Sequence, residues 1–464
     1  VALLTLFALM GAALVVPVVA QASGEVAAVE KFFAANCKEA FKECGHKVEE
    51  AEVPLPFSFL YGGAKQKYSV TEPIPNTEQG KKESKEQGFN TAGGHVPFGV
   101  TDFKIATFDA EEKEAGPGKL PHQKPTQIVT HIRTDVAPGL STSPTAVPIC
   151  SGHNFGEAET PGAFGVELIK GSGLFTAPSC AKASEIGVNE ATVYVELKPK
   201  ENADLPLIGK VYNLAPPEGR ASLFGVALKL PKELIKAKLK AGFEKAEAEG
   251  AKPGENGFPS LPEQAFLEAE QWYAHTLIEG NVEWGKEANG TGLGDYHDYF
   301  EINVSPELPI ISSRLTFFGN QESEPGQTGD FITNGTNCPG HHTTSFKETD
   351  KEGVTAKAEY ETVIGLEECP APFEPLFTLA PATTQDDTPN GFTATLTTPR
   401  HPKKTEQDTA EVKTAEFTLP EGMTMNPAAA AGLTACTPGQ ARIHSSEKGV
   451  ACPSSSEIGS VALN

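Results

Sequence analysis

Hydrophobic and polar positions alternate in many short runs of this chain, which is the pattern of β-strands. Over residues 128–134, isoleucine or threonine occupies every second position. The same two-residue period recurs at 193–197, 300–304 and 392–396. Glycine, proline and asparagine separate the runs, as in antiparallel sheets with one face in water. Strands and helices do not alternate regularly, which argues against an α/β fold. The sequence predicts a mainly β protein.

One long segment, residues 231–275, departs from this pattern. Ile235, Leu239 and Phe243 are four residues apart, as on one face of a helix, and Pro253 and Gly254 then break the pattern. A second helix is predicted to begin at a capping box formed by Ser260 and Glu263. We therefore expect a helical hairpin inserted into a β-domain, packing over a sheet edge rather than acting as a functional lid.

Near the N-terminus, the spacing of Val29, Phe33, Cys37 and Cys44 also follows a helical period. Two cysteines seven residues apart on one helix lie about 10 Å from each other, which is too far for a disulfide. Either the pair stays open or the helix breaks near Asn36, and we favour the break. Further on, residues 79–88 are charged and lack apolar periodicity, so we expect a linker at a domain boundary.

The first 20 residues carry no charge and are mostly alanine, valine and leucine. They are long enough to span a bilayer as an anchor. Pro17 and the small residues Ala20 and Ala22 instead favour a signal peptide over residues 1–22, cleaved after Ala22. We expect a secreted or cell-surface protein that contacts the membrane through this segment alone.

The eight cysteines fall into four pairs of sequence neighbours, none of them in a C-x-x-C motif. An even count in an exported chain indicates disulfides rather than a zinc ribbon or a redox dithiol. Many connectivities remain possible for eight cysteines, and pairing between neighbours is the hypothesis. The candidate bridges are Cys37–Cys44, Cys150–Cys180, Cys338–Cys369 and Cys436–Cys452.

Composition narrows the class of protein further. With 464 residues, the chain has the length of about three domains. Lysine and arginine total 38 against 61 acidic residues, which gives a net charge of −23. Phosphate is repelled by such a field, so nucleic acid is excluded as a partner.

An internal repeat links the middle of the chain to its end. Residues 135–187 and 417–459 share a Pro/Gly turn, a pair of cysteines and a Ser-Glu-Ile-Gly sequence that follows the second cysteine. In the first copy this sequence leads into the strand predicted at 193–197. We expect the matching strand of the second copy to continue past Asn464, and further repeats to follow it.

The order of these features along the chain resembles that in a group of uncharacterised secreted bacterial surface proteins with repeated modules. The resemblance rests on the disulfide module and on four short motifs, which are Gly93-Gly94-His95, residues 211–217 (VYNLAPP), residues 294–296 (GDY) and residues 333–338 (TNGTNC). Those proteins have proline directly after the Gly-Gly-His motif, where this chain has Val96 first. The resemblance implies tandem antiparallel Ig-like β-sandwich modules and no known activity.

We therefore expect a mainly β chain of tandem Ig-like β-sandwich modules with one inserted helical hairpin. The expected divisions are a signal peptide (1–22), an N-terminal segment with a cysteine pair (23–85), module 1 (86–200), module 2 with the helical insertion (201–320, insertion 231–275), a short cysteine-paired β segment (321–372) and a truncated repeat of module 1 (373–464).

Candidate metal ligands are sparse. Asp295 and Asp298 offer hard oxygens for calcium, but they lack the spacing of a calcium-binding loop, so they are weak candidates and we expect no metal. Serine-hydrolase, dinucleotide-binding and P-loop motifs are also missing. Cys150 precedes His153 closely enough to mimic a protease dyad, but we interpret it as a structural half-cystine. The expectation is a protein without cofactor or catalytic activity.

The function that follows is a structural or adhesive element of the cell surface or extracellular matrix. Its expected partners are a cell-envelope or extracellular polymer, or other copies of its own modules. The alternative is a carbohydrate-binding or carbohydrate-cleaving protein, in which exposed rings of the 272–299 segment stack on sugars. Core packing is the favoured interpretation of those rings, which belong to Trp272, Tyr273, Trp284, Tyr296 and Tyr299.

Overall fold

The fold is described from a computed structural model of the whole chain. It describes residues 29–462 except for 40–43, 53–66, 110–122, 157–174, 199–200, 231–271, 287–293, 307–308, 320–329, 370–372, 400–406, 424–431, 443–448 and the single positions 176, 387, 389, 411, 413 and 433.

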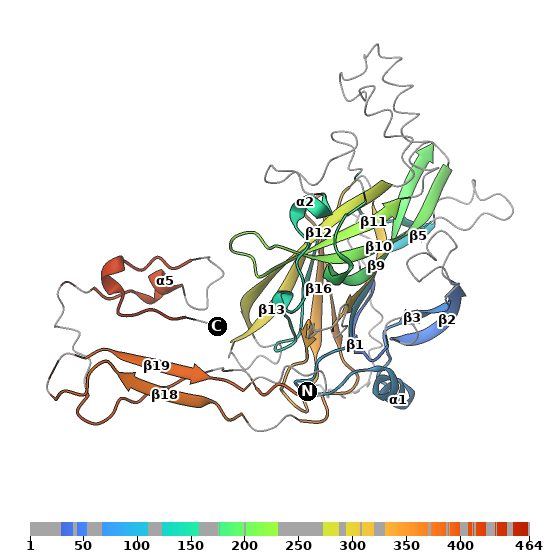
Figure 1. Cartoon of the computed structure of the whole chain (residues 1–464). Helices are drawn as coiled ribbons and strands as arrows, with labels where there is room; N and C mark the ends of the chain where they lie inside the picture. The colour runs from blue at the N-terminus through green and yellow to red at the C-terminus, as the bar shows by residue number, and fades with distance from the viewer. Residues whose placement is uncertain are drawn as a thin grey trace, which may run out of the picture.

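One antiparallel sheet dominates the described part of the chain (Figure 1). It has eleven strands there, each hydrogen-bonded to its neighbours in the sheet. In spatial order they are β1 (Val29–Cys37), β4 (Phe98–Ile105), β14 (Ile310–Phe318), β9 (Glu185–Lys198), β10 (Glu201–Leu214), β11 (Ser222–Leu230), β12 (Trp272–Lys286), β13 (Gly294–Asn303), β7 (Val129–Asp135), β16 (Thr343–Asp350) and β17 (Thr355–Glu361).

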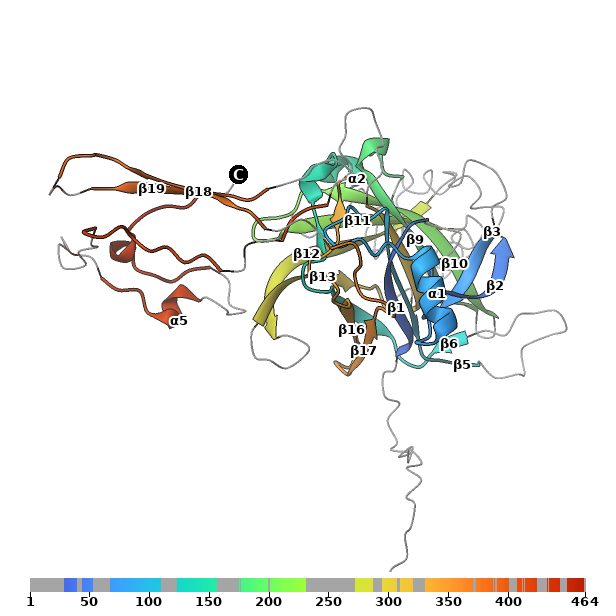
Figure 2. The same ribbon diagram turned by 90° about the horizontal axis from the view of Figure 1, so that it is seen from below.

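The sheet curls until its two edge strands, β1 and β17, come into contact. Figure 2 shows the strands arranged around a common interior. Side chains close the seam. The rings of Phe32 and Phe346 stack with centroids 5.0 Å apart, and Phe33 meets Tyr360 edge-on at 6.2 Å. The result is a near-barrel.

Shorter elements surround this near-barrel. The two-stranded sheets pair β2 (His46–Glu52) with β3 (Lys67–Glu72), β5 (Thr107–Asp109) with β6 (Gln123–Pro125), β8 (Ser141–Thr142) with β15 (Ile332–Thr333), and β18 (Leu376–Pro381) with β19 (Phe392–Thr397). The described helices are α1 (Glu78–Gln87), α2 (Gly152–Phe155) and α5 (Pro438–Ala441), with 3-10 turns at η3 (Pro144–Ala146), η4 (Lys182–Ser184) and η5 (Ser454–Ser456).

Strands β10 to β12 bury side chains on both faces, and β11 is a nearly continuous apolar run. Their inner face contributes to the main core, together with Trp272 of β12. Their outer face packs under α2, where the ring of Phe155 is fully buried. A Cβ at Gly225 would lie 2.5 Å from Cζ of Phe155, so the glycine makes room for this ring.

The prediction of a mainly β, antiparallel protein is confirmed, and the strands predicted at 128–134, 193–197, 300–304 and 392–396 all form. Strands from the segments expected as modules 1 and 2 lie in the same sheet. They are joined there by the long pairing of β9 with β10, in which Val193 lies opposite Leu205.

The helix predicted from the spacing of Val29, Phe33 and Cys37 is wrong, because Val29–Cys37 is strand β1. Val29, Phe33 and Cys37 are four residues apart, and an even spacing also places residues on one face of a strand. The chain then turns, and the Cα atoms of Cys37 and Cys44 come within 6.0 Å.

The linker predicted at residues 79–88 is also wrong, because this segment belongs to helix α1. The signals that form the helix are polar rather than periodic. Thr77 caps its N-terminus by accepting a hydrogen bond from the amide of Gly80 at 3.1 Å. Along its exposed face, Lys81 pairs with Glu78 at 2.8 Å and Gln79 donates to Glu83 at 3.0 Å.

Replacing Thr77 with alanine is expected to destabilise α1 by about 1 kcal/mol, because the amide of Gly80 loses its acceptor. Hydrogen exchange of the α1 amides measures this loss. Lys82→Ala is the control, since its exposed pair with Glu86 at 3.8 Å contributes a few tenths of a kcal/mol. Equal protection in the two variants would show that the cap does not stabilise α1.

The predicted helical hairpin (231–275) lies mostly outside the described residues, as does the predicted signal peptide. The part of the hairpin that is described, from Trp272 to His275, is the start of strand β12 and not a helix. No helix in the described ranges is long and apolar enough to cross a membrane.

The two copies of the internal repeat share their local structure. Each begins with a turn that has glycine at positive φ, at Gly139 (86°) and Gly422 (89°). After the first cysteine, each forms a one-turn helix capped by a hydroxyl, from Ser151 in α2 and from Thr437 in α5.

After the second cysteine, each copy forms a 3-10 turn, η4 or η5. In these turns, Ser184 and Ser456 donate to the carbonyl oxygens of Ala181 and Pro453, both at 2.7 Å. The copies differ in burial. Ile186 is 1% exposed at the start of β9, whereas its counterpart Ile458 is 80% exposed.

Candidate functional site

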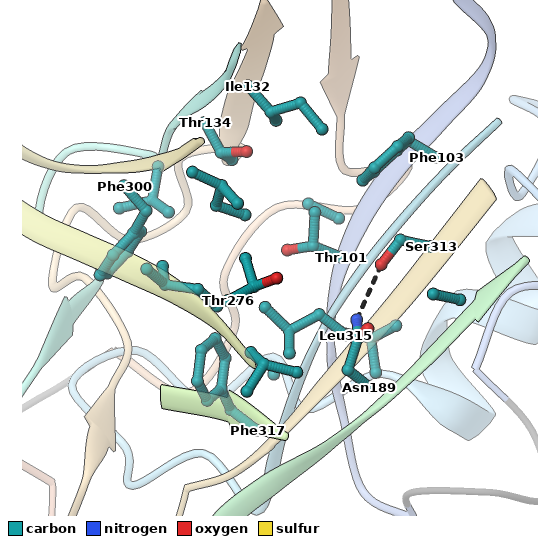
Figure 3. Close-up of a pocket in the computed structure, with 18 of the residues that line it drawn as sticks. Thr101, Phe103, Ile132, Thr134, Asn189, Thr276, Phe300, Ser313, Leu315 and Phe317 are labelled. Atoms are coloured by element: carbon teal, nitrogen blue, oxygen red, sulfur yellow. Dashed lines mark hydrogen bonds between the residues drawn. The ribbon is translucent and has the colours of Figure 1, made fainter. Parts of the chain in front are cut away.

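A cavity of about 570 Å³ lies inside the near-barrel (Figure 3). Its volume falls within the range of roughly 300–1,000 Å³ that is typical of small-molecule sites. Ten strands of the main sheet contribute to its wall, and Ser305, an exposed residue just after β13, is among the lining residues. The cavity therefore reaches the rim of the barrel at the β13–β14 connection.

Most of the cavity wall is aliphatic or aromatic. Inward-facing Leu315, Phe317 and Phe300 retain exposed surface although they point into the barrel (Figure 3). They therefore present apolar surface to the cavity. The other apolar residues of the wall include Ile132, Val193, Leu207, Val226, Leu228, Ile278, Ile302 and Ile310.

Polar groups interrupt this wall on three adjacent strands, β9, β14 and β4. The side-chain amide of Asn189 donates to the hydroxyl of Ser313 at 2.7 Å (Figure 3). Both residues are buried, at 8% and 7% exposure. Thr101 lies opposite Leu315 in the β14–β4 register, two residues beyond Ser313. We call Thr101, Asn189 and Ser313 the polar patch.

Further hydroxyl residues line the wall around the barrel, at Thr134, Ser141, Thr142, Thr276, Ser305, Thr344 and Thr362. In Figure 3, Thr134 lies on the opposite side of the view from Asn189 and Ser313. The cavity is therefore apolar with a few hydrogen-bonding groups at defined positions, which is the usual character of a ligand site.

Ionisable groups in the described wall are few. Burial, followed by the neighbouring charge of His341, lowers the pKa of His342 to about 4, so its imidazole is neutral at physiological pH. A carboxylate oxygen of Asp298 accepts a hydrogen bond from the amide of Thr142 at 3.2 Å. His275 is stacked between the rings of Phe155 and Phe175, at centroid distances of 4.5 and 4.6 Å.

The outer face of β7 and β13 has the opposite character and carries a network of charges. Arg133 forms hydrogen bonds with Asp135 and Glu283, and its guanidinium lies 4.0 Å from the ring centroid of Tyr299. His297 adds a contact to Asp135 at 3.1 Å. Burial opposes ionisation of Asp135, but the hydrogen bonds from His297 and Arg133 and the charge of Arg133 lower its pKa overall. This outer face is therefore polar, while the inner face lines the cavity.

All eight candidate cysteines lie in bonded pairs of sequence neighbours. The Cα separations are 6.0 Å for Cys37–Cys44, 5.4 Å for both Cys150–Cys180 and Cys338–Cys369, and 5.2 Å for Cys436–Cys452. Disulfides of this number are typical of an oxidising, extracellular environment.

The structure does not bring the candidate glycan-binding aromatics to one surface. Trp272 is fully buried in the main core, whereas Tyr296 is 58% exposed. Tyr273 is half-buried beside α2, and Tyr299 lies under Arg133. Trp284 belongs to β12, opposite Tyr296.

The weak calcium candidates, Asp295 and Asp298, lie on β13. Within the part of the chain that the structure describes, no three histidine, cysteine or acidic side chains gather as metal ligands. The carboxylate of Asp298 instead binds the backbone at the edge of the cavity.

Sequence reasoning did not identify the polar patch, although the sequence contains a signal for it. Asn189 falls in phase with Gly187, Ala191 and Val193 along β9, so it is a polar residue on an otherwise small and apolar face. Nothing in one sequence shows that the face encloses a cavity, because this depends on how strands from distant segments close around it.

Comparisons with protein-family models, with curated proteins and with solved structures gave no match to this chain. The fold and the site together therefore define its class, which is a disulfide-linked antiparallel near-barrel with an apolar internal cavity.

Proposed function

We propose that the near-barrel binds an apolar small molecule in its internal cavity. The observation that carries this proposal is the cavity of about 570 Å³ itself, with its aliphatic and aromatic wall and its few placed polar groups. Apolar side chains around such a space lack packing partners on the side that faces it. A bound ligand restores those contacts.

A neutral fluorescent probe, N-phenyl-1-naphthylamine, tests the proposal. The folded protein is expected to bind it with a rise in fluorescence. Thr276→Trp places an indole in the cavity and is expected to weaken binding at least about tenfold, because ligand and indole compete for one space. Titrations of the two proteins measure the difference.

The matched control is Asn281→Trp, which places the same indole on β12 outside the cavity wall. Circular dichroism and thermal unfolding confirm that each variant is folded. Two results would overturn the proposal. One is a folded wild-type protein that does not bind the probe, and the other is equal binding by Thr276→Trp and Asn281→Trp.

A second proposal concerns the chain as a whole, which would be an exported surface or matrix protein with repeated Ig-like modules. The observation in its favour is the matching local structure of the two disulfide modules, at Cys150–Cys180 and Cys436–Cys452. Electron microscopy of the complete native protein, released from intact cells, is the test. Beaded rods attached to the envelope would support a scaffold, and compact particles free in the medium would contradict it.

A further inference from the structure

We infer that the cavity selects a neutral amphiphile, which is an apolar body with one hydroxyl or carbonyl group, and that this group binds at the polar patch. The inference rests on the proposed binding of an apolar molecule and adds its chemical class and its orientation. It is carried by the arrangement of Thr101, Asn189 and Ser313 and by the charges that the described wall lacks.

The hydrogen bond between Asn189 and Ser313 leaves a donor at the polar patch. Ser313 uses its oxygen to accept from Asn189 at 2.7 Å, so its own proton is available for an acceptor in the cavity. The amide nitrogen of Asn189 also approaches the carbonyl oxygen of Arg314 at 3.5 Å, which helps to fix the amide. A hydroxyl or carbonyl oxygen of the ligand would accept from Ser313.

The surroundings of the patch favour a neutral group over an anionic one. Among the described residues of the wall there is no lysine or arginine. His342 is neutral at physiological pH, and Asp298 would repel an anion. A carboxylate or phosphate head would lose its hydration inside the barrel without gaining a counter-charge.

A pure hydrocarbon is disfavoured for a different reason. It would cover the patch and leave the Ser313 proton without an acceptor, and a buried donor that loses water without a replacement costs free energy. An alcohol of equal length fills the same space and satisfies that proton. The expected order of affinity is therefore alcohol first, with hydrocarbon and carboxylate both behind it.

Displacement of N-phenyl-1-naphthylamine by dodecan-1-ol, dodecane and dodecanoate at pH 8 tests this order. The three ligands share one chain length, and the carboxylate is ionised at that pH. We expect dodecan-1-ol to displace the probe at a concentration about five- to tenfold lower than either other ligand requires, which is the effect of one satisfied hydrogen bond. Dodecanoate as effective as dodecan-1-ol would overturn the inference, and this wild-type comparison requires no variant.

The variant Ser313→Ala then tests whether the preference for the alcohol arises from the polar patch. It is expected to bring dodecan-1-ol and dodecane to the same level, because the alcohol loses its hydrogen bond and the hydrocarbon no longer covers an unpaired donor. Ser312→Ala is the matched control, because Ser312 precedes Ser313 on β14 and does not line the cavity. An equal effect of Ser313→Ala on all three ligands would contradict the assignment. If the wild-type protein did not bind the probe at all, the proposed function itself would fail, which is a separate outcome.

Discussion

Replacing Asp102 with alanine is expected to lower the free energy of unfolding by about 3–5 kcal/mol. Asp102 is buried on β4 at 6% exposure and forms ion pairs with two cations from other parts of the chain. One carboxylate oxygen lies 3.0 Å from Nη1 of Arg314, and the other lies 3.1 Å from Nζ of Lys31. Without Asp102, both positive charges would remain largely buried and would lose this counter-charge.

The loss of stability should extend beyond the two ion pairs of Asp102, because Arg314 and Lys31 also attach the β2–β3 hairpin to the sheet. Arg314 donates to the hydroxyl of Thr71 at 2.9 Å and to the carbonyl oxygen of Cys44 at 3.1 Å. Lys31 donates to the carbonyl oxygen of Thr71 at 3.0 Å. Repulsion between the unpaired cations would weaken these contacts, so hydrogen exchange in β3 is expected to rise in the variant.

Urea denaturation measures the effect, and Glu30→Ala is the control. Glu30 forms an ion pair with Lys104 at 2.7 Å across the same two strands, but this pair is exposed. Its loss is expected to cost at most about 1 kcal/mol, since water screens and solvates surface charges. If the two variants lost equal stability, burial would not be what gives the Asp102 network its strength.

Much of the fold could be predicted from the sequence, because hydrophobic and polar residues alternate wherever one face of a strand is buried and the other is exposed to water. β7 shows this clearly, with Ile132 and Thr134 turned inward and Arg133 and Asp135 turned toward solvent. The period gives no information about which strands pair. The joining of eleven strands into one sheet depends on contacts between residues as distant as Phe32 and Phe346.

The two wrong predictions, for the residues of β1 and of α1, also have physical causes. In β1, Phe32 and Phe33 are both buried because side chains cover both faces of the strand, so the alternation disappears and an even spacing imitates a helix. In α1 the apolar stripe is missing because the helix is stabilised by its cap and its charge pairs. The cavity has no signature of its own, since its wall uses the same residues as a filled core.

The cavity and the buried charges follow from one architecture. A sheet that curls into a near-barrel hides its inner face wherever the interior is filled, and it hides its outer face where α2 or the β2–β3 hairpin packs on it. Polar residues on hidden faces then need partners. Asn189 has Ser313, and Asp102 has Arg314 and Lys31. Glu348 is an exception, and it contributes to how stability depends on pH.

Glu348 lies on the inner face of β16, between Phe346 and Asp350 in the alternation of buried residues. Its side chain is fully buried, and within the described part of the chain neither carboxylate oxygen has a hydrogen-bond partner. Burial, helped by the nearby charge of Asp350, raises the pKa of Glu348 from 4.5 to about 7. The folded protein therefore binds a proton here that the unfolded chain releases near pH 4.5.

Stability should consequently fall as pH rises from about 4.5 to 7, because deprotonation is more costly in the folded state than in the unfolded state. Above pH 7 the penalty is complete and amounts to about 3 kcal/mol. Glu348→Gln carries no charge at any pH, so it is expected to match the wild-type protein near pH 4.5 and to exceed it by about this amount at pH 8.

The measurement is the difference in unfolding free energy between the two proteins, from urea denaturation at pH 4.5, 6, 7 and 8. Taking the difference removes other titrating groups, including His342, whose lowered pKa makes stability fall as pH decreases from 6.5 to 4. Glu359→Gln is the control, because Glu359 is exposed on β17 and should give a constant difference. A flat difference for Glu348→Gln as well would mean that the folded state ionises Glu348 without penalty, and that water or a cation reaches it inside the barrel.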